Sequence, residues 1–428
     1  MSSYIAFGLL LFFLLMGLPI YLALGFLALL LFWHDGVPLV ALPQLLVDNL
    51  NSETLLAVPL FVMAATFMQK GGVAGALIDC AQAWVGRQRG GLALVCVIAC
   101  AIFAAICGSS VATAIAIGSV LVPAMVARNY DDRFALGTVG ASGTLGILIP
   151  PSLPMIVYAV IAEESVPRLF LGGVIPGLMQ AGLFIVFIMI FARVKNYPVE
   201  PAMPRDQFMK VNIRAIPALM IPVIILGGIY SGIVTVTEAA GVAALVAIAE
   251  AIFVYRGVKG VEIVGVLAES IKLTATIVFI IVGALAFGHW ITSAGVAEEL
   301  VDYVKSLDLK AWQFLLFINI LMLFLGMFLE VFAIILIVLP LILPILNALE
   351  INLVHFAIVL TINMEIALIS PPIGLNLFVL ASISKKPLGT VVRGIVPYLL
   401  IMLALLTLIT YVPEISLWLP DLVYGKPK

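Results

Sequence analysis

Long apolar stretches separated by short polar gaps make up most of this chain. Between Gly90 and Ala127 there is no Asp, Glu, Lys or Arg, and Gly108-Ser109-Ser110 interrupts the stretch near its middle. One membrane-spanning helix uses about 20 residues, so the stretch predicts two helices or a re-entrant hairpin with the small polar residues at its turn. Non-helical backbone persists at membrane depth only where protein buries it or it lines a water-filled cavity, so the break is a candidate binding site.

The composition extends the membrane interpretation to the whole chain. Of its 428 residues, 64% are hydrophobic and 10% are charged, and the mean hydropathy is +1.27. The one long polar gap, 193–214, is basic and rich in proline, which predicts a linker on the cytoplasmic side under the positive-inside rule. The short gaps leave no room for an extramembrane catalytic module, and the net charge of -2 argues against nucleic-acid binding.

An internal repeat runs across this linker. Ile149-Pro150-Pro151 matches Ser370-Pro371-Pro372 at a displacement of 221 residues. Further pairs at the same displacement are Pro123 with Pro344, Gly173 with Gly394 and Pro176 with Pro397. We therefore predict a first repeat over residues 1–192 and a second over 215–428. Hydrophobic segments interrupted by Gly or Pro in corresponding places are typical of secondary transporters whose site lies at the repeat interface.

Each repeat is expected to contain two interrupted elements. The hairpins are predicted at about 90–127 and about 311–349. The broken helices are predicted at about 134–162 and about 354–384, where the Pro-Pro pairs remove backbone donors and interrupt the helix.

Two isolated acids mark the elements of the second repeat. Glu330 is the counterpart of Ser109 at the hairpin turn, and Glu365 is the counterpart of Thr144 in the broken helix. Acids within a membrane are costly, which favours a functional role over a position at a helix end. Carbonyl, hydroxyl and amide oxygens of an unwound helix can replace the hydration shell of Na⁺, whereas its N-terminal N–H groups favour an anion. The pattern predicts co-transport of a cation with a carboxylate.

The same residues carry a family resemblance. Segments 140–152, 169–177 and 363–376 resemble the large membrane subunit (DctM-type) of tripartite ATP-independent periplasmic (TRAP) transporters, and the similarity runs nearly end to end. Within the last segment, Ala367 stands where the family usually has Gly and Ser370 where it usually has Thr. Both departures are mild and leave the resemblance standing.

The resemblance implies an all-α polytopic protein of the bacterial inner membrane. It implies two inverted repeats, each with scaffold helices, a re-entrant helical hairpin and a broken transmembrane helix, and an elevator-type movement. It also implies sodium-driven uptake of a small carboxylate-bearing solute with no enzymatic activity, no cofactor and Na⁺ as coupling ion. The partners implied are a small membrane subunit (DctQ-type) and a periplasmic substrate-binding protein (DctP-type), with membrane lipid around the chain. The substrate class stays open among C4-dicarboxylates, other organic acids, sialic acids and zwitterionic solutes.

Site residues carry over onto the hairpin turns and unwound helices. The sodium candidates are Ser109, Ser110, Ser142, Thr144, Glu330, Asn363 and Glu365. The substrate candidates are Ser110, Thr113, Gly143, Ser152, Ser370, Gly374 and Asn376. The structural alternative is that the hydroxyls bond to carbonyls one turn back or that small residues let helices pack closely. Thr235 and Glu238, by contrast, have the spacing of a helix cap.

Two other functions compete with symport. Gly140-Ala141-Ser142-Gly143 fits the Gly-x-Ser-Gly of intramembrane serine proteases, with His289 or His355 as the base. The counterpart of Ser142 in the second repeat is Asn363, which is no nucleophile, and this argues against a protease. A sodium-independent anion uniporter or exchanger of the same architecture is the second alternative.

Overall fold

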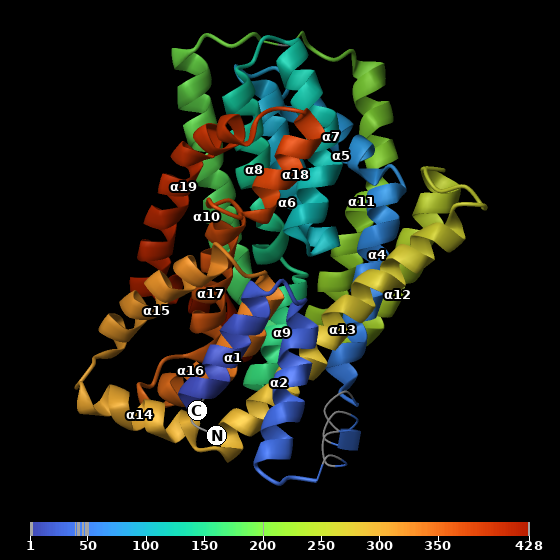
Figure 1. The fold of residues 1–428 in the computed structure, drawn as a ribbon. Coiled ribbons are helices and arrows are strands. Elements are labelled where there is room, and N and C mark those ends of the chain that lie inside the picture. The colour runs from blue at the N-terminus through green and yellow to red at the C-terminus, as the bar shows by residue number, and fades with distance from the viewer. Residues whose placement is uncertain are drawn as a thin grey trace.

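The computed structural model describes residues 3–38, 40, 43–44, 47, 51–199 and 201–426. All regular structure in these ranges is helical (Figure 1). Before the linker the helices are α1 (Ser3–Leu15), α2 (Ile20–His34), α4 (Glu53–Lys70), α5 (Val73–Val85), α6 (Gly91–Cys107), α7 (Ser110–Ala127), α8 (Asp132–Leu148), α9 (Leu153–Ala162) and α10 (Val166–Val194). After it they are α11 (Arg205–Tyr230), α12 (Val236–Ala249), the π-helical turn η1 (Glu250–Val254), α13 (Ile263–Ser293), α14 (Val296–Ser306), α15 (Ala311–Gly326), α16 (Val331–Ala348), α17 (Leu353–Leu368), α18 (Leu375–Ser384), α19 (Leu388–Tyr411) and α20 (Glu414–Tyr424).

The helices have the length and composition of a multi-pass membrane protein. Among the described residues, eight helical segments are long and apolar enough to cross a bilayer, or nine if the pair α4 and α5 is counted as one bent span. That pair bends by 68°. The predicted cap also forms: Thr235 Oγ1 accepts from the Glu238 backbone N–H at 3.2 Å, and Glu238 Oε2 accepts from the Thr235 N–H at 2.8 Å.

Four breaks interrupt the apolar stretches, two in each half of the chain. Gly108 and Ser109 separate α6 from α7, and residues 327–330 separate α15 from α16. Gly108 has a φ of +61°, a backbone conformation that side chains with a Cβ rarely adopt. Residues 149–152 separate α8 from α9, and residues 369–374 separate α17 from α18. Three of these breaks therefore contain the Gly, Ser or Pro residues of the sequence, whereas the break at 327–330 follows Gly326 and ends at Glu330.

The two broken helices run antiparallel, which shows that the repeats are inverted. At one end, Lys386 just after α18 pairs with Asp132 at the start of α8, with Nζ and Oδ2 2.5 Å apart. At the other end, the Tyr158 hydroxyl of α9 donates to the Leu353 carbonyl at the start of α17, over 2.8 Å. The contacts follow the same symmetry, because α7 packs on α18 and its counterpart α16 packs on α9.

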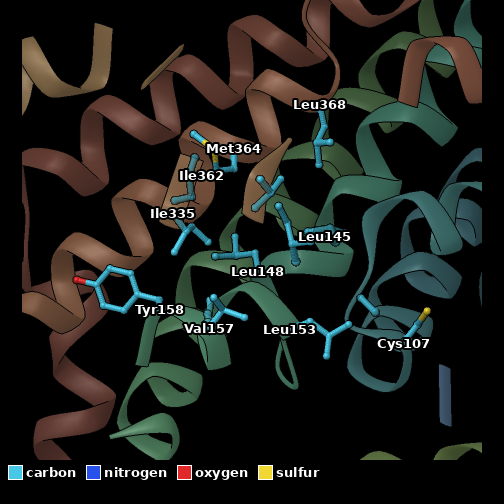
Figure 2. Close-up of a cluster of buried hydrophobic side chains, with 14 of the residues drawn as sticks. Cys107, Leu145, Leu148, Leu153, Val157, Tyr158, Ile335, Ile362, Met364 and Leu368 are labelled. Carbon is cyan, nitrogen blue, oxygen red and sulfur yellow. The ribbon is translucent and has the colours of Figure 1, made fainter. Parts of the chain in front are cut away.

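Close packing holds the two halves together. Leu148, Val157, Ile335 and Met364 come from four different helices and are all buried in the shared core (Figure 2). Lipid tails are as apolar as these side chains, so association of helices in a membrane depends on packing contacts and small residues. A Cβ on Gly137 of α8 would come within 2.0 Å of a backbone oxygen of α19, which shows how closely these helices approach.

Candidate functional site

A cavity of about 350 Å³ lies where the two hairpin turns and the two broken helices meet. The first hairpin contributes Ser109 and Ser110, and the second contributes Glu330. Helices outside the hairpins close the remaining side. Their polar lining residues are Thr66 and Gln69 of α4, and Glu269 and Thr276 of α13. Ser109 and Glu330, which occupy equivalent positions in the two repeats, therefore line the same cavity.

Four helices begin at this cavity. Ser110, Leu153, Val331 and Leu375 are the first residues of α7, α9, α16 and α18, and all four line it. The first N–H groups of a helix have no partner within the helix, and the macrodipole places roughly half a positive charge at this end. Four N-termini around one cavity make a setting that favours a small anion.

The charged side chains among those that line the cavity have the opposite sign. Glu269 and Glu330 are acidic, and within the described residues no Lys or Arg lines the cavity. Lys70 lies close by and pairs with Glu269 at 3.3 Å, but both side chains are nearly half exposed, so water weakens this pair. Carboxylate, hydroxyl and peptide oxygens around positive helix ends suit a cation and an anion bound side by side.

The turn of the first hairpin is held by local hydrogen bonds and by one bond across the repeats. Ser109 Oγ accepts from the Ala112 N–H at 3.4 Å, and Thr113 Oγ1 donates to the Ser109 carbonyl at 2.8 Å. Ser110 Oγ accepts from Asn376 Nδ2 at 2.7 Å, although the two residues lie in different repeats. Asn376 thus ties the start of α18 to the start of α7.

The remaining substrate candidates lie near the breaks but are not among the residues that line the cavity. Ser152 Oγ donates to the Ile147 carbonyl at 2.5 Å, and Ser370 Oγ donates to the Ile366 carbonyl at 2.7 Å. Gly374 directly precedes α18. Gly143 faces α7, where an added Cβ would lie 3.0 Å from the Ala114 Cβ. Thr113 is buried and bonded to the turn.

The other sodium candidates form a second polar region inside α8 and α17. Ser142, Thr144, Asn363 and Glu365 are all buried. Gln180 of α10 donates from Nε2 to Thr144 Oγ1 at 3.2 Å. Among the described residues, Ser142 Oγ, Asn363 Oδ1, Gln180 Oε1 and both carboxylate oxygens of Glu365 have no partner in hydrogen-bonding geometry, although the Gln180 side chain lies near Glu365. Buried oxygens without donors are costly, and a bound cation would satisfy them.

Two amides in this region were not predicted from the sequence. Gln180 is one, and Asn319 of α15 is the other. Asn319 Oδ1 accepts from Asn363 Nδ2 at 2.7 Å, and Asn319 Nδ2 donates to Thr410 Oγ1 at 2.9 Å. A lone amide inside an apolar run is the signal that points to both residues. Thr66, Gln69, Glu269 and Thr276 carry no such signal, because only the tertiary fold brings α4 and α13 to the cavity.

The histidines do not pair with Ser142. His355 Nδ1 lies 2.8 Å from Ser416 Oγ, and its Nε2 lies 3.3 Å from the Thr410 carbonyl oxygen. His289 stacks on Phe32 with ring centroids 5.9 Å apart. Ser142 Oγ has no hydrogen-bond partner among the described residues. The hydrogen bond between nucleophile and base that a serine protease requires is therefore missing from the described part of the chain.

Comparison with known proteins decides the family. A family model described as "Tripartite ATP-independent periplasmic transporter, DctM component" matches residues 7–415. The chain belongs to the DctM family. Members of this family are transporter permeases rather than enzymes, and they work with a small permease subunit and a periplasmic binding protein. Together with the apolar helices, membership places this DctM protein in the bacterial inner membrane as a multi-pass chain.

Similar proteins match nearly the whole length of this chain. The C4-dicarboxylate TRAP transporter large permease protein DctM of Pseudomonas aeruginosa is 46% identical over 397 residues, which cover 93% of this chain and 92% of that protein. The protein of the same name from Vibrio cholerae is 41% identical over 431 residues, covering 96% and 95%. The sialic acid TRAP transporter large permease protein SiaM of Vibrio cholerae is 33% identical over 412 residues, covering 96% of each.

A solved structure supports the fold alone. The crystal structure of the YdaH transporter of Alcanivorax borkumensis, which revealed an unusual topology, superimposes on this chain with a TM-score of 0.62. The superposition covers 88% of both chains at 14% sequence identity. At this identity the similarity concerns the arrangement of helices and says nothing of the solute.

Proposed function

We propose that this DctM protein imports a C4-dicarboxylate, driven by an inward sodium gradient. The observation that carries the proposal is the cavity at which α7, α9, α16 and α18 all begin, between Ser109 of one repeat and Glu330 of the other. The relatives with 40% identity or more described above are named for C4-dicarboxylates, whereas the sialic acid permease is more distant. A dicarboxylate also suits the four positive helix ends.

Sodium binding is assigned to the oxygens of the turns and of the broken helices. In the first repeat these are the Ser109 carbonyl and the side chains of Ser109, Ser110, Ser142 and Thr144. In the second repeat they are the side chains of Glu330, Asn363 and Glu365. The unpartnered oxygens of Ser142, Asn363 and Glu365 support the assignment, because Na⁺ in proteins is held by hydroxyl, amide, carboxylate and carbonyl oxygens.

The substrate is assigned to the cavity itself. Ser110 and Asn376 bond to each other across the repeats, so a carboxylate at the start of α7 and α18 would contact both repeats at once. Thr113, Gly143, Ser152, Ser370 and Gly374 would then act by shaping the turns rather than by touching the substrate.

Movement and partners complete the proposal. The cavity lies between the hairpins and broken helices on one side and α4 and α13 on the other, which is the interface across which an elevator-type movement would carry substrate. We assign residues 193–214 to the cytoplasmic side, and their basic residues support this assignment. A small DctQ-type subunit and a DctP-type periplasmic binding protein would complete the system.

Reconstituted uptake tests the proposal. Proteoliposomes containing this chain and its small partner are given labelled C4-dicarboxylates and binding protein outside, under a sodium or a potassium gradient. Unlabelled isethionate and a sialic acid serve as competitors. Accumulation against a gradient that requires inward sodium and the binding protein is expected. Equilibration of the substrate without sodium would instead indicate a uniporter. Uptake that occurs only when an anion is present inside the vesicles would indicate an exchanger.

A further inference from the structure

A second cavity of about 670 Å³ lies at the end of the molecule from which the linker departs. Its walls come from the end of α7, the start of α8, the end of α10 and the start of α19. Figure 1 shows these helix ends near the linker, on the side opposite to both chain termini. The cavity is therefore separate from the proposed transport site and, by the positive-inside rule, faces the cytoplasm.

Aromatic rings form one wall of this cavity. Tyr130 and Tyr197 stack with ring centroids 4.4 Å apart, and Phe134 and Phe191 stack at 4.7 Å. Tyr197 also accepts the Asp131 N–H at its hydroxyl over 3.3 Å, which fixes the start of the linker against α8. Aromatic residues of this kind are enriched where membrane proteins meet the headgroup region, so the wall lies at the depth of the headgroups.

The rim of the cavity carries excess positive charge. Arg133, Lys195 and Arg393 line it together with a single carboxylate, that of Asp131. Asp131 Oδ1 accepts the backbone N–H groups of Arg133 and Phe134 at 2.8 and 3.3 Å, so this carboxylate caps α8. Within the described ranges, none of the three basic side chains forms a salt bridge. The cavity is thus built to attract an anion that the protein itself does not supply.

The other repeat fills the equivalent place with a helix. Gly394, Pro397 and Phe134 line the cavity, and their counterparts at a displacement of 221 residues are Gly173, Pro176 and His355. There α20 packs on α10 and α17, and its Ser416 bonds to His355. After α10 the chain leaves through the linker instead. The cavity is therefore a position that the fold covers in one repeat and leaves open in the other.

The surface beside the cavity suits an acyl chain. On α10, Ile190 and Val194 flank the lining residue Phe191 and are 58% and 74% exposed. On α19, Val396 and Leu400 lie close to the lining residue Pro397 and are 48% and 62% exposed. α10 and α19 pack together, so the two apolar surfaces lie on neighbouring helices. A soluble anion would use only the charged rim, whereas a lipid would use the rim and this surface.

We propose that the cavity between α8, α10 and α19 binds the phosphate headgroup of an anionic phospholipid from the cytoplasmic leaflet. Arg133, Lys195 and Arg393 contact the phosphate, the aromatic wall lies against the glycerol region, and the acyl chains run along α10 and α19. Basic pockets between transmembrane helices on the cytoplasmic side bind anionic headgroups in this way. The binding does not depend on which solute the protein transports.

Native mass spectrometry of the delipidated full-length protein tests the proposal. Dioleoylphosphatidylglycerol and dioleoylphosphatidylcholine are titrated separately, and glycerol 1-phosphate is added as a soluble competitor. Two double variants are compared. The cavity pair combines Arg133→Gln with Arg393→Gln. The control pair combines Arg205→Gln with Lys210→Gln and so removes two exposed basic residues at the same end of the molecule but outside the cavity. Each basic residue near the headgroup contributes about 1 kcal/mol, so the cavity pair is expected to weaken the binding of the first phosphatidylglycerol molecule about 30-fold.

The outcomes separate the possibilities. The proposal predicts that the control pair changes binding less than threefold and that phosphatidylcholine binds weakly to every form. If the cavity pair does not fold, Lys195→Gln alone is expected to weaken binding about fivefold, because its exposed side chain can be replaced without repacking. Equal binding of the two lipids, or equal losses in both variant pairs, would overturn the proposal. Displacement of the lipid by millimolar glycerol 1-phosphate would show a soluble-anion site instead.

Discussion

Gly146 of α8 is the position at which a single methyl group should disturb the first hairpin turn. A Cβ placed on Gly146 would lie 2.6 Å from the Ser109 carbonyl oxygen and 2.9 Å from Thr113 Oγ1. The carbonyl cannot simply turn away, because it accepts hydrogen bonds from the Thr113 N–H at 3.1 Å and from the Thr113 hydroxyl at 2.8 Å. The substitution Gly146→Ala therefore has to push the whole turn away from α8.

The size of the effect follows from this contact. Reaching an ordinary separation of 3.4 Å requires a shift of about 0.8 Å at the Ser109 oxygen. Overpacking of a close contact lowers the free energy of unfolding by about 1–3 kcal/mol, whereas the better helix propensity of Ala raises it by about 1 kcal/mol. The net loss of stability is then about 0–2 kcal/mol. If the Ser109 carbonyl binds sodium, a shift of this size should raise the sodium concentration for half-maximal uptake at least tenfold, or about 1.4 kcal/mol.

The assay measures uptake against sodium concentration in proteoliposomes, together with the unfolding temperature in detergent. Gly182→Ala is the matched control, because Gly182 lies within α10 and its added Cβ would meet no atom within 4 Å apart from the adjoining backbone of its own helix. The control gains the same helix propensity without the clash, so its unfolding temperature should rise slightly and its sodium dependence should not change.

One result would refute this reasoning. A folded Gly146→Ala protein with the sodium dependence of the original protein would show that the position of the Ser109 carbonyl does not matter for sodium. An unchanged unfolding temperature alone would not do so, because the two stability terms can cancel.

Three further predictions address other contacts. In a double-mutant cycle of Ser110→Ala and Asn376→Ala, unfolding temperatures should give a coupling of about 1 kcal/mol, and additive effects would exclude an energetic link between the repeats. Glu365→Gln keeps the shape of the buried side chain but removes its charge, so sodium-stimulated uptake should fall at least tenfold in a protein that folds normally; unchanged uptake would remove Glu365 from the sodium site. Asp421→Asn weakens the partly buried ion pair with Arg168, in which Oδ1 and the guanidinium nitrogen lie 2.9 Å apart. It should lower the free energy of unfolding by about 1 kcal/mol without changing uptake by the folded protein. Stability and uptake measured on one preparation check both expectations.

The helix breaks could be read from the sequence because the membrane makes interruptions costly. Gly108-Ser109 and the two Pro-Pro pairs stand out in apolar stretches where an uninterrupted helix would satisfy every backbone group. The inverted relation of the repeats could not be obtained in this way, since it requires the number of crossings between them. The ion pair of Asp132 with Lys386 shows the inversion directly, because it joins the start of one broken helix to the end of the other.

The composition of the cavity depends on tertiary contacts and was only partly predictable. Ser109, Ser110 and Glu330 line it because they lie at the turns. Glu269 and Thr276 line it because α13 packs on α16 of the second hairpin, and no local pattern in α13 indicates this. Glu365 shows the opposite case, since its isolation in an apolar run indicates function while the structure buries it in the last turn of α17, outside the set of residues that line the cavity.

The charges at the cavity give a physical reason for the proposed coupling of sodium to a dicarboxylate. Glu330 lines the cavity and lies at the start of α16, so each charge of a bound dianion about 5 Å away would be repelled by about 3 kcal/mol at an effective dielectric constant of about 20. A sodium ion between Glu330 and the substrate offsets this repulsion, because it attracts both at a shorter distance. Sodium must then raise the affinity for the substrate, and by linkage the substrate must raise the affinity for sodium by the same factor. In this scheme Glu330 discourages the dianion from binding alone, which limits leakage of substrate without sodium.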